Sequence, residues 1–241
     1  MKQYTYVGFI SLFLLVTSLV AQNNPLDEPR TRVLNDFHQL NVYSGIYVNL
    51  IPAKVNKAII YGDRYGSIRL IQKGKTLKLR RRLDELFYST KAYVDLYFKP
   101  PLNSIKLHQK ANLSTEAILQ QNHLQLNVHE GSKFKGTVNT KQLITKVRTG
   151  GHALVDGTAE QHRIIVSTGG LCKAMKLSTN RTRIKIFAGG KANIFAKDQI
   201  EASVAFGGNI WILGNPKNLI ARRTIAGQIN HYDNTLTETS N

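Results

Sequence analysis

Apolar and polar residues alternate along much of this chain, and paired small residues interrupt the alternation at a nearly constant spacing. Four glycine pairs follow one another at intervals of 19, 20 and 18 residues: Gly150-Gly151, Gly169-Gly170, Gly189-Gly190 and Gly207-Gly208. Gly131-Ser132 and Ala226-Gly227 extend the series by 19 residues on either side. A fixed period of this length is typical of a solenoid, in which one coil cannot bury its apolar side without its neighbours.

The positions around each pair keep their character from unit to unit. Apolar residues recur three and five positions before the pair and again three and five positions after it. The residues three positions after the first member of each pair are Phe134, Ala153, Cys172, Ala192 and Ile210. Alternation with period two on both sides of a corner predicts two short strands per coil, each with one face inward. Glycine suits the corner because it adopts positive φ without steric cost. Cys172, the single cysteine, is expected to be a small buried residue.

Outside the repeats, the chain indicates a single β domain with a segment at each end. Lys2 and the uncharged run Val7–Val20 predict a secretory signal peptide over residues 1–21, because about 14 apolar residues are too few to span a bilayer. Residues 22–31 are expected to be an exposed leader and 233–241 a disordered tail. Residues 32–232 would form the β domain, with the glycine-pair repeats at about 123–230. Within residues 33–101, the run Val42–Leu50 and the alternating run Ala92–Phe98 read as strands.

An opening signature supports this interpretation. The pattern Phe37-x-x-Leu40-x-Val42-x-x-Gly45-Ile46-x-Val48-x-Leu50, followed by glycine-rich units of near 20 residues, resembles the head GIN domain family, described as putative autotransporter adhesins. The resemblance covers roughly residues 32–232, although members typically have Gly-Ser-Gly corners where this chain has Thr149-Gly150-Gly151. It implies an all-β fold, a right-handed parallel β-helix with coils of about 19–20 residues. It also implies an exported protein in the periplasm, at the outer-membrane surface or outside the cell.

The charge of the chain suggests what it binds. Its 33 Lys and Arg against 15 Asp and Glu give a net charge of +18. Many cations occupy outward positions of the repeat, and these are the candidate polyanion-binding residues: Lys133, Lys135, Lys146, Arg148, Arg163, Lys173, Arg183, Lys185 and Lys191. Stacked coils should align them on two faces at a pitch of about 4.8 Å. Such a surface either serves solubility alone or fits an anionic glycan or another envelope polyanion. Specific nucleic-acid recognition is not expected, and the oligomeric state is left open.

Catalytic chemistry has little support in the sequence. The acidic residues of the repeat region do not pair at alternate positions of one strand, as a glycoside hydrolase would require. The seven histidines lack metal-ligand spacing and are expected at surfaces or coil edges. We therefore predict no catalytic residues, metal or cofactor, and a non-enzymatic adhesion or scaffold module. The alternative is a β-helix polysaccharide-processing enzyme, a lyase or a hydrolase. Tyr93, Tyr97 and Trp211 have rings that could stack on sugars, although single exposed aromatics more often serve surface packing.

Overall fold

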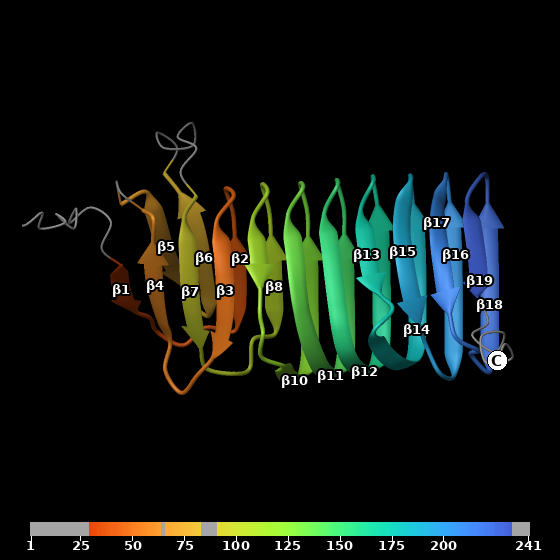
Figure 1. Ribbon diagram of the computed structural model, residues 1–241, viewed down its shortest axis with the longest axis horizontal. Coiled ribbons are helices and arrows are strands. Elements are labelled where there is room, and N and C mark those ends of the chain that lie inside the picture. The colour runs from red at the N-terminus through yellow and green to blue at the C-terminus, as the bar shows by residue number, and fades with distance from the viewer. Residues whose placement is uncertain (1–28, 64–65, 83–90, 233–241) are drawn as a thin grey trace, which may run out of the picture.

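The computed structural model describes residues 29–63, 66–82 and 91–232, and these form an elongated stack of short β-strands (Figure 1). The predicted leader falls largely outside the described residues, and the signal peptide and the tail lie wholly outside them. No helix in the described ranges has the length and apolarity to cross a membrane. The strands are β1 (Arg30–Val33), β2 (Gln39–Val42), β3 (Tyr47–Pro52), β4 (Lys57–Tyr61), β5 (Ile68–Lys73), β6 (Thr76–Arg81), β7 (Tyr93–Phe98), β8 (Ser104–Leu107), β9 (Asn112–Ser114), β10 (Leu119–Val128), β11 (Lys133–Val147), β12 (His152–Ser167), β13 (Leu171–Ala174), β14 (Leu177–Phe187), β15 (Gly190–Phe195), β16 (Gln199–Ala205), β17 (Gly208–Leu213), β18 (Asn218–Thr224) and β19 (Gln228–Tyr232).

Each coil contributes one strand before its corner and one after it. We call the two resulting surfaces the pre-corner sheet and the post-corner sheet. The pre-corner sheet runs β6, β2, β8, β10, the second halves of β11 and β12, then β14, β16 and β18, all parallel. The post-corner sheet runs β7, β3, β9, the first halves of β11 and β12, then β13, β15, β17 and β19. The solenoid expected from the glycine period is therefore confirmed.

The first coils do not stack in sequence order. The β2–β3 coil lies between the β6–β7 coil and the β8–β9 coil, because β2 pairs with both β6 and β8 and β3 with both β7 and β9. Antiparallel strands complete the N-terminal end: β5 pairs with β6, while β4 pairs with β7 and β1 with β4. The expectation of one strand over Val42–Leu50 was wrong, because a corner at Ser44 and Gly45 divides this run into β2 and β3.

The interior is made of aligned columns, one residue per coil. Phe134, Ala153, Cys172, Ala192 and Ile210 stack in direct register. All five are buried, and Cys172 is 0% exposed. The predicted column and the buried position of the cysteine are therefore confirmed.

One inward column contains a histidine. His162 is 3% exposed, so the expectation that all the histidines lie at surfaces or coil edges was wrong for this residue. Its Nε2 atom shares a 2.9 Å hydrogen bond with the hydroxyl of Thr145 in the preceding coil. Burial lowers the pKa of His162 to about 3, so the ring is neutral inside the core at pH 7.

The corners share one backbone geometry. At each corner within the described ranges two consecutive residues have positive φ, for example Thr149 (48°) and Gly150 (68°). The N–H of Gly151 then donates to the carbonyl of Arg148 at 2.9 Å, and this combination matches a type I′ turn. Gly150 also donates to the Thr168 carbonyl of the next coil at 3.0 Å, so the parallel ladder continues through the corner.

Candidate functional site

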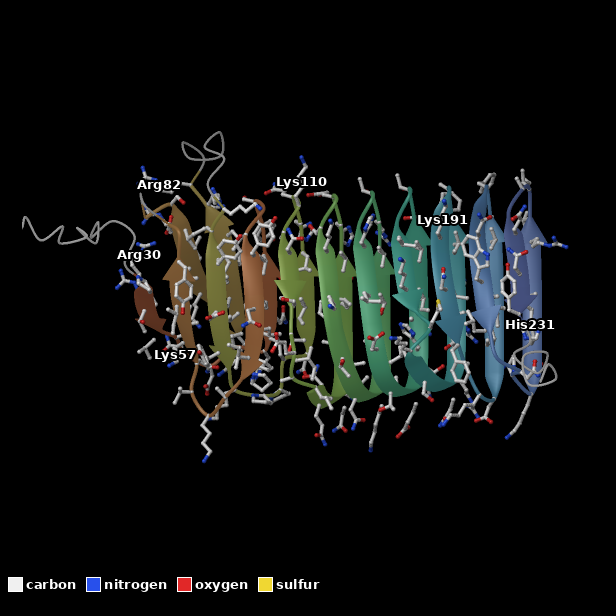
Figure 2. All side chains as sticks on the ribbon, in the orientation of Figure 1. Arg30, Lys57, Arg82, Lys110, Lys191 and His231 are labelled. Atoms are coloured by element: carbon white, nitrogen blue, oxygen red, sulfur yellow. The ribbon has the colours of Figure 1, made fainter. Side chains whose placement is uncertain are left out.

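The nine candidate cations divide between the two sheets. Lys133, Lys135, Lys173 and Lys191 lie on the post-corner sheet, and all four are exposed. Lys146, Arg163, Arg183 and Lys185 lie on the pre-corner sheet, with Arg148 just beyond its last paired position. Figure 2 shows side chains projecting along the whole stack, with Lys191 over the C-terminal half and Lys110 at the row of corners.

The lysines of the post-corner sheet are staggered. The register places Lys133, His152, Leu171 and Lys191 in one outward column. The neighbouring column is Lys135, Leu154, Lys173 and Asn193. Within each column, therefore, no two lysines occupy directly adjacent coils. At about 4.8 Å per coil, Lys135 and Lys173 are about 10 Å apart, and Lys133 and Lys191 are about 14 Å apart. Staggering reduces repulsion between like charges and still keeps the surface positive.

The cations of the pre-corner sheet are partly neutralised or interrupted. Arg163 and Arg183 are direct neighbours, but the guanidinium of Arg183 donates to both carboxylate oxygens of Glu201, at 2.8 and 3.0 Å. This bidentate contact lowers the pKa of Glu201 and raises that of Arg183. In the adjacent column Ile165 separates Lys146 from Lys185. The pre-corner sheet is thus the weaker of the two basic surfaces.

A column of stacked rings stands beside the corners. Tyr43 stacks on His108 with ring centroids 5.1 Å apart, and His108 stacks on His129 at 5.2 Å. Arg148 occupies the next coil of this column. Partial burial, followed by the charges of His108 and Arg148, lowers the pKa of His129. A proton on His129 would therefore stand close to the positive charge of Arg148 in the next coil.

A hollow of about 390 Å³ opens on the post-corner sheet between the tyrosines of the first coils and the first lysine pair. Tyr93 and Tyr47 come from β7 and β3 on one side, with ring centroids 5.2 Å apart and planes tilted by 35°. The small side chains of β9 form its floor, and Lys133 and Lys135 of β11 border the other side. The hollow exists because short side chains on β9 lie between long ones on both adjacent strands.

Polar groups beside the hollow are already oriented. The side-chain amide of Asn49 donates to the carboxylate of Asp95 at 3.1 Å. Burial and, after it, the charge and hydrogen bond of Asp95 raise the pKa of Tyr61 on the adjoining strand β4. Asp95 is the one carboxylate among the described residues that line the hollow. The site therefore offers hydrogen-bond acceptors but no carboxylate pair for glycoside hydrolysis.

Two further hollows differ in chemistry. One of about 360 Å³ near the C-terminal end of the post-corner sheet is lined mainly by apolar and aromatic side chains, including Trp211 and Tyr232, beside Lys191. Another of about 380 Å³ follows the bend between the two sheets and is lined by amides and hydroxyls such as Asn139 and Thr158. No group of three or more potential metal-ligating side chains was found within the described ranges.

Sequence reasoning identified the lysines but not the hollow. The alternation in β7 already marked Tyr93 as outward, and Tyr93 was named among the rings able to stack on sugars. Tyr47 and Asn49 were missed because they meet Tyr93 and Lys133 only through the unexpected stacking order of the first coils. Asp95 follows Tyr93 on β7, but the same stacking order decides that it shares a hollow with Lys133. Trp211, also expected to be outward, is partly buried in the C-terminal hollow. Tyr97 stands under the ammonium of Lys57, 4.5 Å from its ring centroid.

Comparisons with known proteins agree with this architecture. The family model described as "putative auto-transporter adhesin, head GIN domain" matches residues 36–216. A putative adhesin from Bacteroides fragilis has a similar structure, with a TM-score of 0.76 at 18% identity over 85% of this chain and 96% of that one. A putative lipid binding protein from Parabacteroides distasonis gives 0.63 at 17% over 85% and 96%. A putative adhesin from Parabacteroides merdae gives 0.61 at 17% over 83% and 95%. These three similarities are evidence for the fold alone, and no curated protein matches the chain.

Proposed function

The chain belongs to the head GIN domain family of putative auto-transporter adhesins, and we propose that it is a non-enzymatic adhesion module that binds an anionic polymer through its post-corner sheet. One observation carries the proposal. Lys133, Lys135, Lys173 and Lys191 are exposed on three of four successive coils, and among the described residues none of the four lies in an ion pair. An unneutralised, staggered row of cations presents its full charge to a ligand that lies along the solenoid axis.

The geometry of the row favours a linear ligand. From β11 to β15 the lysines extend over three steps of the stack, about 14 Å at about 4.8 Å per step. A linear polymer that lies along this axis meets several lysines at once, and each neutralised charge releases counterions. An adhesin that binds a surface polymer in this way would act outside the cytoplasm, in agreement with the description of its family as putative auto-transporter adhesins.

The experiment compares two matched quadruple variants. One changes Lys133, Lys135, Lys173 and Lys191 to Gln, and the other changes the pre-corner cations Lys146, Arg163, Arg183 and Lys185 to Gln. Both remove four charges, so net charge is controlled. Binding to sodium polygalacturonate and to polyphosphate is measured at several salt concentrations. We expect the post-corner variant to lose most of its affinity and its log–log salt slope to flatten by about one per lysine removed.

The pre-corner variant should keep most of its affinity. Circular dichroism and thermal melts establish that both variants retain the β-rich fold, since all the changed side chains project outward. Equal losses in the two variants would mean that the post-corner sheet has no special role. Wild-type protein that binds neither polymer at low salt would refute polyanion binding altogether.

A further inference from the structure

We propose that the hollow lined by Tyr47, Tyr93, Asn49, Asp95 and Lys133 is a sugar subsite, so that the anionic polymer is an acidic glycan. This inference rests on the function proposed above and specifies its ligand class. With a volume of about 390 Å³, the hollow is near the lower end of the range of about 300–1,000 Å³ for small-molecule sites. It therefore suits one or two sugar units of a longer chain.

The tyrosine wall supplies an apolar contact surface. Tyr93 lines the hollow and is 46% exposed, so part of its ring surface is open to a ligand. The ammonium of Lys91 lies 6.0 Å from the centroid of the Tyr47 ring, so Tyr93 is the more accessible of the two faces. A pyranose ring has a face of C–H groups that packs against such an aromatic face and removes apolar surface from water.

The opposite wall supplies positive charge. Lys133 and Lys135 stand on β11, two strands from Tyr47 and three from Tyr93, which is about 10 and 14 Å at about 4.8 Å per strand. A carboxylated sugar stacked at the tyrosines can therefore direct its carboxylate, or that of the next unit, toward these ammonium groups. The rest of the polymer would continue over Lys173 and Lys191.

Asp95 distinguishes a sugar from other polyanions. Its carboxylate is oriented by a hydrogen bond from Asn49 and can accept further hydrogen bonds that sugar hydroxyls donate. The same negative charge repels a phosphate or sulfate placed against it. A hydroxyl-rich ligand with one carboxylate per unit can stack on the tyrosine, donate hydrogen bonds to the aspartate and pair its carboxylates with the lysines. A densely charged phosphate polymer can only pair with the lysines.

The test uses the whole protein and a short ligand. Binding of a galacturonic acid tetrasaccharide, its methyl ester and polyphosphate is measured by calorimetry for wild type, Tyr93→Ala, Tyr93→Phe and Tyr232→Ala. The Tyr232→Ala control also removes an exposed tyrosine from the post-corner sheet, but at the far end of the stack. We expect Tyr93→Ala to weaken tetrasaccharide binding by about tenfold, as for single stacking rings in nucleic-acid sites, and to leave polyphosphate binding unchanged.

The companion variants separate stacking from other effects. Tyr93→Phe retains the ring and should bind the tetrasaccharide like wild type, as should Tyr232→Ala. Asp95→Asn removes the repelling charge and should strengthen polyphosphate binding while it weakens tetrasaccharide binding. The methyl ester, which lacks the carboxylate charge, should bind more weakly than the acid and should still depend on Tyr93.

Failure of this inference differs from failure of the proposed function. If wild type binds polyphosphate through the four lysines but Tyr93→Ala leaves tetrasaccharide binding unchanged, the sugar subsite is refuted and the basic surface remains. If single-stranded nucleic acid depends on Tyr93 and the tetrasaccharide does not, the hollow accepts bases and the sugar assignment is wrong. If wild type binds none of these ligands at low salt, both proposals fall.

Discussion

At the scale of single residues, two adjacent glycines of one corner have different physical roles. Gly150 has φ of 68°, and a Cβ atom built on it would meet no atom within 4 Å. Gly151 has no such positive φ, but its Cβ would stand 2.3 Å from the carbonyl oxygen of Val128 in the preceding coil. The first glycine lets the backbone adopt positive φ without steric strain, whereas the second allows one coil to approach the next. Thr149, which also has positive φ, shows that the corner does not demand glycine at every left-handed position.

This difference predicts unequal costs for the same substitution. Gly150→Ala should lower the free energy of unfolding by about 1 kcal/mol, the cost of a side chain in the left-handed region. Gly151→Ala should lower it by about 2–4 kcal/mol, because the backbone of two coils must separate. Urea denaturation of both variants measures the difference. Equal effects, or a larger effect at Gly150, would contradict the close approach seen at Val128.

At the scale of stacked strands, side chains of neighbouring coils satisfy one another across the interior. Thr145 on β11 and His162 on β12 occupy adjacent inward columns and form one hydrogen bond, with Thr145 fully buried and His162 nearly so. An isolated polar group in this position would cost free energy, so the pair is tolerated only because both members are present. The stack therefore couples residues 17 positions apart in sequence.

The burial of His162 predicts how stability depends on pH. The pKa of His162 is about 3 in the folded protein and about 6.5 when unfolded, so the unfolded chain binds the proton more readily. The histidine therefore adds no pH dependence to the free energy of unfolding above pH 6.5. As the pH drops from 6.5 toward 3, the free energy of unfolding falls by about 1.4 kcal/mol per pH unit. The double variant Thr145→Val, His162→Leu should flatten this loss, as followed by urea denaturation between pH 4.5 and 7.

The single variant Thr145→Val serves as its control. It keeps the buried histidine and should therefore keep the pH dependence, although the free energy of unfolding decreases at every pH. A double variant that is as sensitive to acid as wild type in this range would show that other groups govern the loss of stability.

At the scale of the whole molecule, positive charge is spread along the solenoid. The net charge is +18, and cations occur on both sheets and on several successive coils. Staggering of the lysines and the Arg183–Glu201 pair limit the repulsion locally, but the total charge still opposes the compact state. Some stability is therefore sacrificed for a positive surface, as expected if that surface binds a ligand.

Salt should therefore stabilise the free protein. Raising NaCl from about 0.02 M to about 0.3 M shortens the screening length from more than 20 Å to less than 10 Å, below the extent of the basic surface. We expect the melting temperature to rise by a few degrees. The post-corner quadruple Gln variant, with four charges fewer, should show a smaller rise. A melting temperature that falls with salt would mean that favourable ion pairs outweigh the repulsion.

Much of the fold could be predicted from the sequence because the repeat is encoded locally. Each unit carries its own corner and its own inward columns, so the register of Ala153, Cys172, Ala192 and Ile210 followed from spacing alone. The nine outward cations followed from the same alternation. His162 escaped this reasoning because a single polar residue in an apolar column does not reveal whether a partner such as Thr145 satisfies it.

The sequence by itself determined the period, the inward and outward alternation and the positive charge, because nearest neighbours along the strand and one coil away fix these properties. Only the tertiary structure decided which coil lies beside which at the N-terminal end. There the chain places β6–β7 outside β2–β3, and so brings Tyr93 against Tyr47 and both toward Lys133. No local pattern specifies that order, since strand pairs with similar inward columns can stack in more than one sequence. The candidate sugar subsite therefore depends on long-range packing, whereas the basic surface beside it depends on the repeat.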